Sequence, residues 1–268
     1  MHTVGWLDLD GVVNMRDLGG LPTGDGGSTR HGRLIRSDNL QDLSPSAVTT
    51  LLKDLGVTDV VDLRTVVEVA EEGDGPLRAS PLVTFHHLTL YPDDARLPAA
   101  DPETLPRPEE TGAAGECVET QSEEGHDQRW SEEYLMYLAN RPDSVIAALR
   151  AIANSRGAAI VHCAAGKDRT GTIIGLVLKV AGVTDEAIMA DFAASAERVP
   201  LILARLSKRP AYQENLRSKT ANSQSPRVDT MRRLLETLEA RYNGAAGWLE
   251  QNGWTQEETE RLRRKLRD

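Results

Sequence analysis

Residues 158–171 read AAIVHCAAGKDRTG and combine an expected strand, a loop and the start of an expected helix. The apolar run at 158–161 is typical of a short strand that is buried on both faces. Residues 171–181 are apolar on nearly every side, which is typical of a helix inside a hydrophobic core. The loop between them therefore leads into a helix N-terminus, where unpaired backbone N–H groups and the positive end of the helix dipole favour a bound anion.

The same loop places a thiol and a guanidinium six residues apart. Cys163 lies where a helix N-terminus and a nearby cation favour the thiolate, which is the nucleophilic form. Arg169 provides a planar fork for two oxygens of a phosphoryl group, and its grip is expected to tighten in the transition state. Thr170 is expected to hydrogen-bond the sulfur and to stabilise it as a leaving thiolate.

Two glycines let the backbone of this loop curl so that successive N–H groups point inward. They are Gly166 and Gly171. The residues expected to bind phosphate are Ala164, Ala165, Gly166, Lys167, Asp168 and Arg169.

The whole string, between a strand and a helix, resembles the phosphate-binding loop of the cysteine-based protein tyrosine phosphatases. Its GKDRTG ending is similar to the atypical bacterial group of the mycobacterial protein tyrosine phosphatase B type. Further segments that resemble this group are NMRDLGG at 14–20, DLR at 62–64 with Glu68 after it, ADF at 190–192 and the closing stretch 242–266. The resemblance covers most of the chain and implies a metal-independent phosphatase that works through a phospho-cysteine intermediate.

The resemblance also implies a class of substrates. Phosphotyrosine is the leading one, phosphoserine, phosphothreonine and phosphoinositides are further candidates, and inorganic phosphate is expected to bind in the loop. Lys167 adds a second cation suited to multiply phosphorylated or lipid headgroups, and the similar loop of the phosphoinositide phosphatases carries a lysine there. A solvated lysine is the plainer interpretation.

Two residues are candidates for the general acid that protonates the leaving oxygen. Asp168 lies within the loop itself. Asp93 follows Tyr91 and Pro92 after an expected strand, and this trio resembles the Trp-Pro-Asp loop of classical tyrosine phosphatases, although it lies much farther upstream of Cys163. Since a structural role for Asp168 and a solvated position for Asp93 are equally good interpretations, the choice stays open.

Three further residues are expected to support the loop. Glu68 is expected to orient Arg169, as a carboxylate does in related enzymes, and a surface acid is an equal alternative. Arg64 belongs to the DLR segment that resembles the bacterial group. His162 is expected to hydrogen-bond the loop rather than to take part in the chemistry.

Strands alternate with helices along the chain, which predicts an α/β fold with a mostly parallel central sheet flanked by helices. The site is then expected at the carboxyl ends of the strands. The expected strands are 34–36, 57–63, 83–90 and 158–162. Helices are expected to begin at Ser44 with Pro45, at Asp143, at Thr184, at Arg227 and at Thr255 with Glu258.

The net charge of −10 lies in one segment. Residues 93–133 contain 13 acidic and 3 basic residues, so the rest of the chain is formally neutral. This segment is also rich in proline and glycine, a composition that nucleates little core and is typical of an insertion. We therefore expect one phosphatase domain over 1–268 with an insertion at 94–130, in the place where the resembled group carries a lid. A plain surface loop is the alternative, and Cys117 within it is expected to be an incidental exposed thiol.

Composition argues against several other classes of protein. The pI is near 5.2 and no basic stripe appears, which argues against nucleic-acid binding. His86 and His87 are neighbours on an expected strand and point to opposite faces, so they share no metal, and neither a metal nor a cofactor is expected. No run of 18 apolar residues predicts an integral membrane segment. Two cysteines and no visible signal peptide favour the cytoplasm, while the resemblance leaves export open.

Two alternative functions use a similar loop. A sulfur transferase of the rhodanese type also holds a cysteine in an anion-binding loop, but it needs neither Asp168 nor a threonine after the arginine. A non-catalytic phosphate-binding module is expected to have lost either Cys163 or Arg169, and both are present.

Overall fold

A six-stranded mixed sheet forms the centre of the protein, seen in a computed structural model that describes residues 4–92, 123–217 and 219–267. The strand order is β1-β2-β3-β6-β4-β5. The strands are β1 (Gly5–Trp6), β2 (Arg16–Asp17), β3 (Leu34–Ser37), β4 (Val57–Asp62), β5 (Thr84–His87) and β6 (Ala158–His162). β3, β6, β4 and β5 are parallel, and β1 and β2 extend the sheet as an antiparallel edge beside β3. β6 is therefore a central strand.

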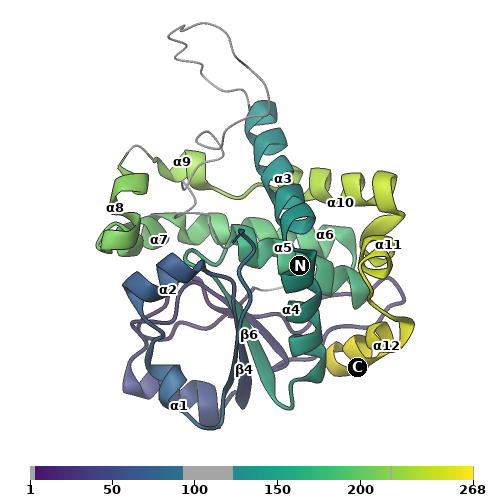
Figure 1. Ribbon diagram of the computed structural model, residues 1–268. Helices are drawn as coiled ribbons and strands as arrows, with labels where there is room; N and C mark the ends of the chain where they lie inside the picture. The colour runs from purple at the N-terminus through teal and green to yellow at the C-terminus, as the bar shows by residue number, and fades with distance from the viewer. Residues whose placement is uncertain (1–3, 93–122, 218, 268) are drawn as a thin grey trace, which may run out of the picture.

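Helices cover both faces of this sheet (Figure 1). The α-helices are α1 (Pro45–Lys53), α2 (Val66–Glu72), α3 (Glu123–Asn140), α4 (Pro142–Asn154), α5 (Asp168–Val180), α6 (Asp185–Ala194), α7 (Val199–Leu206), α8 (Pro210–Leu216), α9 (Ala221–Gln224), α10 (Val228–Tyr242), α11 (Gly244–Gln251) and α12 (Gln256–Leu266). Short 3₁₀ helices occur at Pro76–Ala79 and Ser195–Arg198. Within the described ranges, no helix has both the length and the apolar character that crossing a membrane requires.

The strands divide their side chains between two cores because neighbouring residues of a strand point to opposite faces. On β6, Ala158 and Ile160 pack in the core that includes α1. Ala159 and Val161 pack in the larger core that includes α4 and α5. All five residues of β6 are buried, as expected of a central parallel strand.

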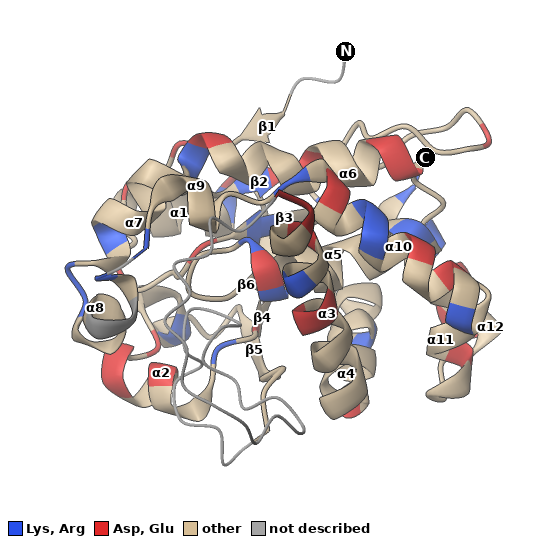
Figure 2. Ribbon diagram, turned by 90° about the horizontal axis from the view of Figure 1, so that it is seen from above, with Lys and Arg blue, Asp and Glu red and all other residues tan. Residues whose placement is uncertain are grey.

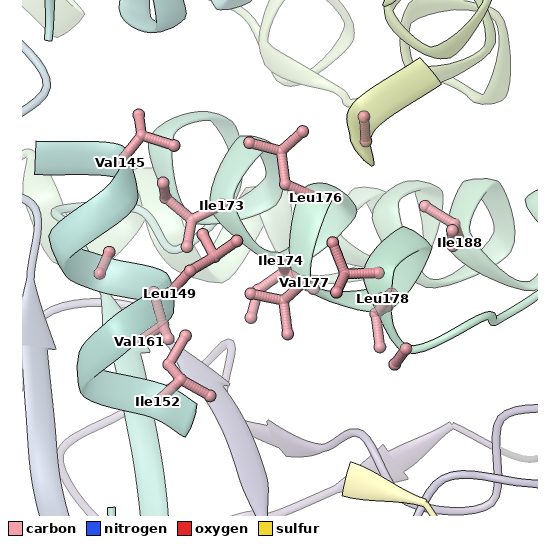
Figure 3. Close-up of a cluster of buried hydrophobic side chains, with 14 of the residues drawn as sticks. Val145, Leu149, Ile152, Val161, Ile173, Ile174, Leu176, Val177, Leu178 and Ile188 are labelled. Carbon is pink, nitrogen blue, oxygen red and sulfur yellow. The ribbon is translucent and has the colours of Figure 1, made fainter. Parts of the chain in front are cut away.

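Helix α5 is buried on nearly every side. Figure 3 shows Ile173, Ile174 and Val177 of α5 in one cluster with Leu149 of α4 and Val161 of β6. The buried strand and the buried helix therefore fix both ends of the loop that joins them.

The α/β fold and the mostly parallel sheet predicted from the sequence are confirmed. The expected strand at 83–90 is shorter, because only Thr84–His87 pairs with β4. Ser44, Thr184 and Thr255 cap α1, α6 and α12 with their side-chain oxygens, as predicted.

The prediction that Asp143 caps a helix is wrong. Pro142 occupies the first helical position of α4, where its fixed φ and missing N–H are well suited. The N-cap position therefore falls to Arg141. Asp143 lies in the first turn instead, with its carboxylate 3.0 Å from the Arg141 guanidinium.

Only the last eight residues of the segment expected as an insertion, 123–130 out of 94–130, lie within the described residues. They form the first two turns of α3, and His126, Asp127 and Trp130 are buried there. This part of the acidic segment therefore belongs to the folded body. Asp93, Cys117 and the rest of the segment lie outside the described residues.

Candidate active site

The loop between β6 and α5 has its carbonyl groups hydrogen-bonded from behind. The donors are Asn39 N to Ala164 O at 3.0 Å, Asn14 Nδ2 to Ala165 O at 2.9 Å, and Arg36 to Gly166 O at 2.8 Å and to Lys167 O at 3.3 Å. The C=O and N–H groups of a trans peptide unit point in opposite directions. The N–H groups of residues 165–168 therefore face the other side of the loop, where they can bind an anion.

Cys163 lies on this N–H side. The Gly166 N–H donates to Cys163 Sγ at 3.3 Å, and the cysteine is only 2 % exposed. Gly166 has a φ of +70°, and a Cβ there would lie 2.4 Å from the Ser37 carbonyl. The backbone conformation and the close approach of β3 both require glycine at this position.

Arg169, in the first turn of α5, is held by Glu68 of α2. The two terminal guanidinium nitrogens donate to Glu68 Oε2 at 2.6 Å and to Oε1 at 2.9 Å. Glu68 is itself fixed by a capping box, in which the Thr65 N–H donates to its carboxylate at 2.7 Å. Burial opposes both charges, but their mutual attraction outweighs it, so that the pKa of Arg169 is raised well above its ordinary value and the pKa of Glu68 is lowered. The pair keeps Arg169 charged and in one orientation.

The carboxylate of Asp168, the first residue of α5, contacts Tyr134 and Lys167. The Tyr134 hydroxyl donates to Oδ1 at 2.7 Å, and Lys167 Nζ lies 2.9 Å from Oδ2. Lys167 Nζ also lies 4.7 Å from the centre of the Trp130 ring. Lys167 is 4 % exposed, so the interpretation as a solvated lysine does not hold. Its ammonium group is instead shared between a carboxylate and an aromatic face.

The aromatic ring of Tyr91 lies beside the Arg169 guanidinium. The Arg169 guanidinium carbon lies 5.5 Å from the centre of the Tyr91 ring. The Tyr91 hydroxyl donates to Glu133 Oε1 at 3.0 Å and lies 3.0 Å from the Tyr137 hydroxyl. Burial, together with the charge of Asp168, raises the pKa of Glu133 above its ordinary value. Tyr91 is thus fixed by α3 against the guanidinium.

The sequence did not reveal that α3 contributes to the site. The available signal was the spacing of Trp130, Tyr134 and Tyr137, which are four and three residues apart and therefore lie on one face of a helix. The acidic composition up to residue 133 obscured this pattern.

Thr170 does not make the predicted hydrogen bond to the sulfur. Its side chain is buried, and its hydroxyl has no hydrogen-bond partner among the residues that the structure describes. Cys163 Sγ accepts the N–H of Gly166 instead.

His162 and Arg64 lie behind the loop at the ends of β6 and β4. His162 Nδ1 lies 3.3 Å from Cys163 O, and burial lowers the pKa of His162 to about 4. Arg64 donates through Nε to Asp62 Oδ1 at 2.9 Å. Both side chains are buried and make contacts of a supporting kind.

Helices α7 and α8 cover the loop from one side. Ala164 packs against Ile202 and Leu206 of α7 and against Tyr212 of α8. The Tyr212 hydroxyl also donates to Glu68 Oε1 at 3.2 Å. In Figure 2, α2, α3, α7 and α8 surround the end of β6. The lid expected at 94–130 stays a prediction, because residues 94–122 lie outside the described residues.

Of the residues singled out in the sequence, the loop residues 163–169 and Glu68 come together in one site. Arg64 and His162 lie behind it, and Asp93 lies outside the described residues. Among the residues that the structure places, no three His, Cys, Asp or Glu side chains are grouped as metal ligands.

Comparison with known proteins agrees with this geometry. Residues 7–268 match the model of the family described as "Tyrosine phosphatase family". The triple specificity protein phosphatase PtpB of Mycobacterium tuberculosis is 33% identical over 220 residues, which cover 75% of this chain and 73% of the relative. A tyrosine-protein phosphatase of Nostoc commune is 30% identical over 148 residues, which cover 50% of this chain and 48% of the relative. None of these matches favours a sulfur transferase. The chain therefore belongs to the tyrosine phosphatase family and is a phosphatase.

Proposed function

We propose that Cys163 is the nucleophile of this phosphatase and that Arg169 binds the transferring group. The observation that carries the proposal is the two-point contact of Arg169 with Glu68, which fixes a guanidinium at the start of the helix that follows Cys163. A fixed donor fork stabilises transition-state charge without reorganising during the reaction.

In the first step, the Cys163 thiolate attacks phosphorus. The S–P bond forms while the bond between phosphorus and the leaving oxygen breaks. Arg169 and the N–H groups of residues 165–168 hold the three remaining oxygens. In the second step, water attacks phosphorus and the S–P bond breaks, which releases inorganic phosphate and restores the thiolate.

We assign the general acid to Asp168. It would donate a proton to the leaving oxygen in the first step and accept one from the attacking water in the second. The support is its place in the loop and the hydrogen bond from Tyr134, which fixes the carboxyl group. Asp93 is the alternative acid.

We propose phosphotyrosine as the first substrate, because the Tyr91 ring beside Arg169 provides an aromatic wall for a phenyl ring. Phosphoserine, phosphothreonine and phosphoinositides follow, and the name of the M. tuberculosis relative, a triple specificity phosphatase, supports such a range. For a multiply phosphorylated headgroup, Lys167 would exchange its contact with Asp168 for a second phosphate.

The test is a turnover panel in a metal chelator. The substrates are a phosphotyrosine peptide, the same peptide with phosphoserine, and a phosphoinositide in vesicles, with Cys163→Ser as the control. The highest kcat/KM is expected for phosphotyrosine, and Cys163→Ser should release no phosphate. Residual activity of Cys163→Ser within about tenfold of wild type, a loss of only about 1.4 kcal/mol, would sink the nucleophile assignment.

A further inference from the structure

A buried ion cluster lies directly behind the loop and takes no part in the reaction just described. It consists of Arg16 of β2, Arg36 of β3 and Asp191 of α6. Arg16 Nε donates to Asp191 Oδ1 at 2.7 Å, and an Arg36 terminal nitrogen donates to Oδ2 at 2.6 Å. Both arginine side chains are fully buried. Burying two cations with one anion is costly, which calls for a reason why the protein keeps them.

The cluster is connected to the loop by two hydrogen-bond donors, Arg36 and Asn14. The other terminal nitrogen of Arg36 donates to Gly166 O at 2.8 Å. Arg16 donates to Asn14 Oδ1 at 2.9 Å, which leaves Asn14 Nδ2 to donate to Ala165 O at 2.9 Å. Asp191 thus orients both arginines, and Arg16 orients the Asn14 amide.

These two hydrogen bonds act on consecutive peptide units. Ala165 O and Gly166 O are held on the rear side, so the N–H groups of Gly166 and Lys167 face the front. The Gly166 N–H does point to Cys163 Sγ, at 3.3 Å. Glycine gives this segment more backbone freedom than any other residue would, so its peptide units need an external restraint.

We propose that Asn14, Arg36 and Asp191 are positioning residues that hold the peptide units after Ala165 and Gly166 with their N–H groups directed at the bound phosphoryl group. This inference rests on the proposed function of the loop. It also gives a role to two sequence segments that the mechanism left without one. NMRDLGG at 14–20 supplies Asn14 and Arg16, and ADF at 190–192 supplies Asp191.

Three variants distinguish an effect on the orientation of the loop peptide units from an effect on the charge of the cluster and from an effect on protein stability. Asn14→Ala removes one neutral donor. Arg36→Lys keeps the positive charge, but an ammonium cannot reproduce the planar fork that spans Asp191 and Gly166 O. Thr29→Val is the matched control, because Thr29 is buried and its hydroxyl donates to Leu18 O at 2.6 Å, away from the loop.

The readouts are the affinity for inorganic phosphate and the rate of Cys163 alkylation by iodoacetamide as a function of pH. Asn14→Ala and Arg36→Lys should each weaken phosphate binding about tenfold or more, because each misdirects a loop N–H group that otherwise donates a charge-assisted hydrogen bond to the phosphate. Their alkylation midpoints should move to higher pH, because misaligned N–H groups stabilise a thiolate less. Thr29→Val should keep wild-type phosphate affinity and alkylation while losing a comparable amount of thermal stability.

The outcomes distinguish this inference from the proposed function. If phosphate fails to protect Cys163 of the wild-type protein from alkylation, the proposed function itself is wrong. If phosphate protects the wild type, and both variants fold yet match Thr29→Val in phosphate affinity and alkylation, the proposed function stands and the positioning role is overturned. If Arg36→Lys keeps full phosphate affinity while Asp191→Asn loses it, charge rather than orientation is what matters, which also overturns the proposal.

Discussion

Glu68 and Arg169 are 101 residues apart in the chain, yet both oxygens of the Glu68 carboxylate accept hydrogen bonds from the Arg169 guanidinium. The capping box of α2 and the N-terminal turn of α5 hold the two ends of this contact. Because both helices are anchored to the central sheet by β4 and β6, the sheet sets the distance between them. The orientation of Arg169 is therefore a property of the fold.

Glu68→Gln should lower kcat far more than it raises KM. The amide keeps the size of the side chain but accepts only one of the two hydrogen bonds, so Arg169 is no longer held in one orientation. A loss of about 100-fold in kcat is expected, since small misplacements of a catalytic group have effects of this size. Steady-state kinetics with nitrophenyl phosphate measure it.

The matched control for this substitution is Glu72→Gln, in the same helix. Glu72 is also nearly buried and pairs with Arg209 at 2.8 Å rather than with Arg169. Equal kinetics for Glu68→Gln and Glu72→Gln would mean that the Glu68 contact has no role in turnover.

Asp168→Asn and Asp93→Asn separate the two candidate acids by the dependence on the leaving group. A general acid matters for a poor leaving group and little for nitrophenolate. Asp168→Asn should therefore lower kcat/KM about 100-fold or more for a phosphopeptide, and much less for nitrophenyl phosphate. The basic limb of the pH profile should also disappear. If only Asp93→Asn shows this pattern, the assignment to Asp168 is wrong.

Gly166→Ala should destabilise the protein more than Gly26→Ala does. Both glycines have a positive φ, but a Cβ at Gly166 would lie 2.4 Å from the Ser37 carbonyl, whereas the space around Gly26 is open. Gly26→Ala should cost about 1–2 kcal/mol for the left-handed backbone alone. Gly166→Ala adds the clash with β3 and should also abolish activity, which urea unfolding and phosphatase assays measure. Equal unfolding free energies would show that the loop does not press against Ser37.

Because of His162, the free energy of unfolding should fall as the pH is lowered from about 6.5 to about 4. Burial lowers the pKa of His162 from 6.5 to about 4, so in this range the unfolded chain binds the proton more readily than the native protein. The difference amounts to roughly 3 kcal/mol in the free energy of unfolding. His162→Gln should lose this part of the pH slope, whereas His31→Gln, at a histidine whose side chain is 74% exposed, should keep it. Identical slopes for wild type and His162→Gln would contradict this prediction.

Local patterns were enough to predict the four parallel strands and the loop, but not the antiparallel edge strands β1 and β2. The run at 158–161 is apolar and short, and it is followed by a loop that contains a glycine and then by a continuous apolar helix. The sequence therefore indicated the strand, the loop and the helix separately. The caps at Ser44, Thr184 and Thr255 were predictable for the same reason, since each depends on three or four neighbouring residues.

The surroundings of the loop could not be read in this way. The cluster behind it joins Arg16, Arg36 and Asp191, and its contacts span up to 175 residues of chain. The position of α7 and α8 over the loop depends on how these helices pack. The apolar face of a helix in the sequence does not indicate which surface it packs against. The aromatic face of α3 was missed because the segment was judged by its overall charge and not by the helical spacing of its aromatic residues.

Trapping the phospho-enzyme during turnover tests directly whether Cys163 carries the phosphoryl group. Nitrophenyl phosphate is mixed with the protein, the reaction is quenched in acid within one turnover, and the peptides that contain Cys163 and Cys117, the two cysteines of the chain, are weighed by mass spectrometry. A phosphoryl group should appear on Cys163 alone, at the rate of the nitrophenolate burst, and should be absent from Cys163→Ser. Full turnover with no phosphoryl group on Cys163, or the same label on Cys117, would contradict the mechanism.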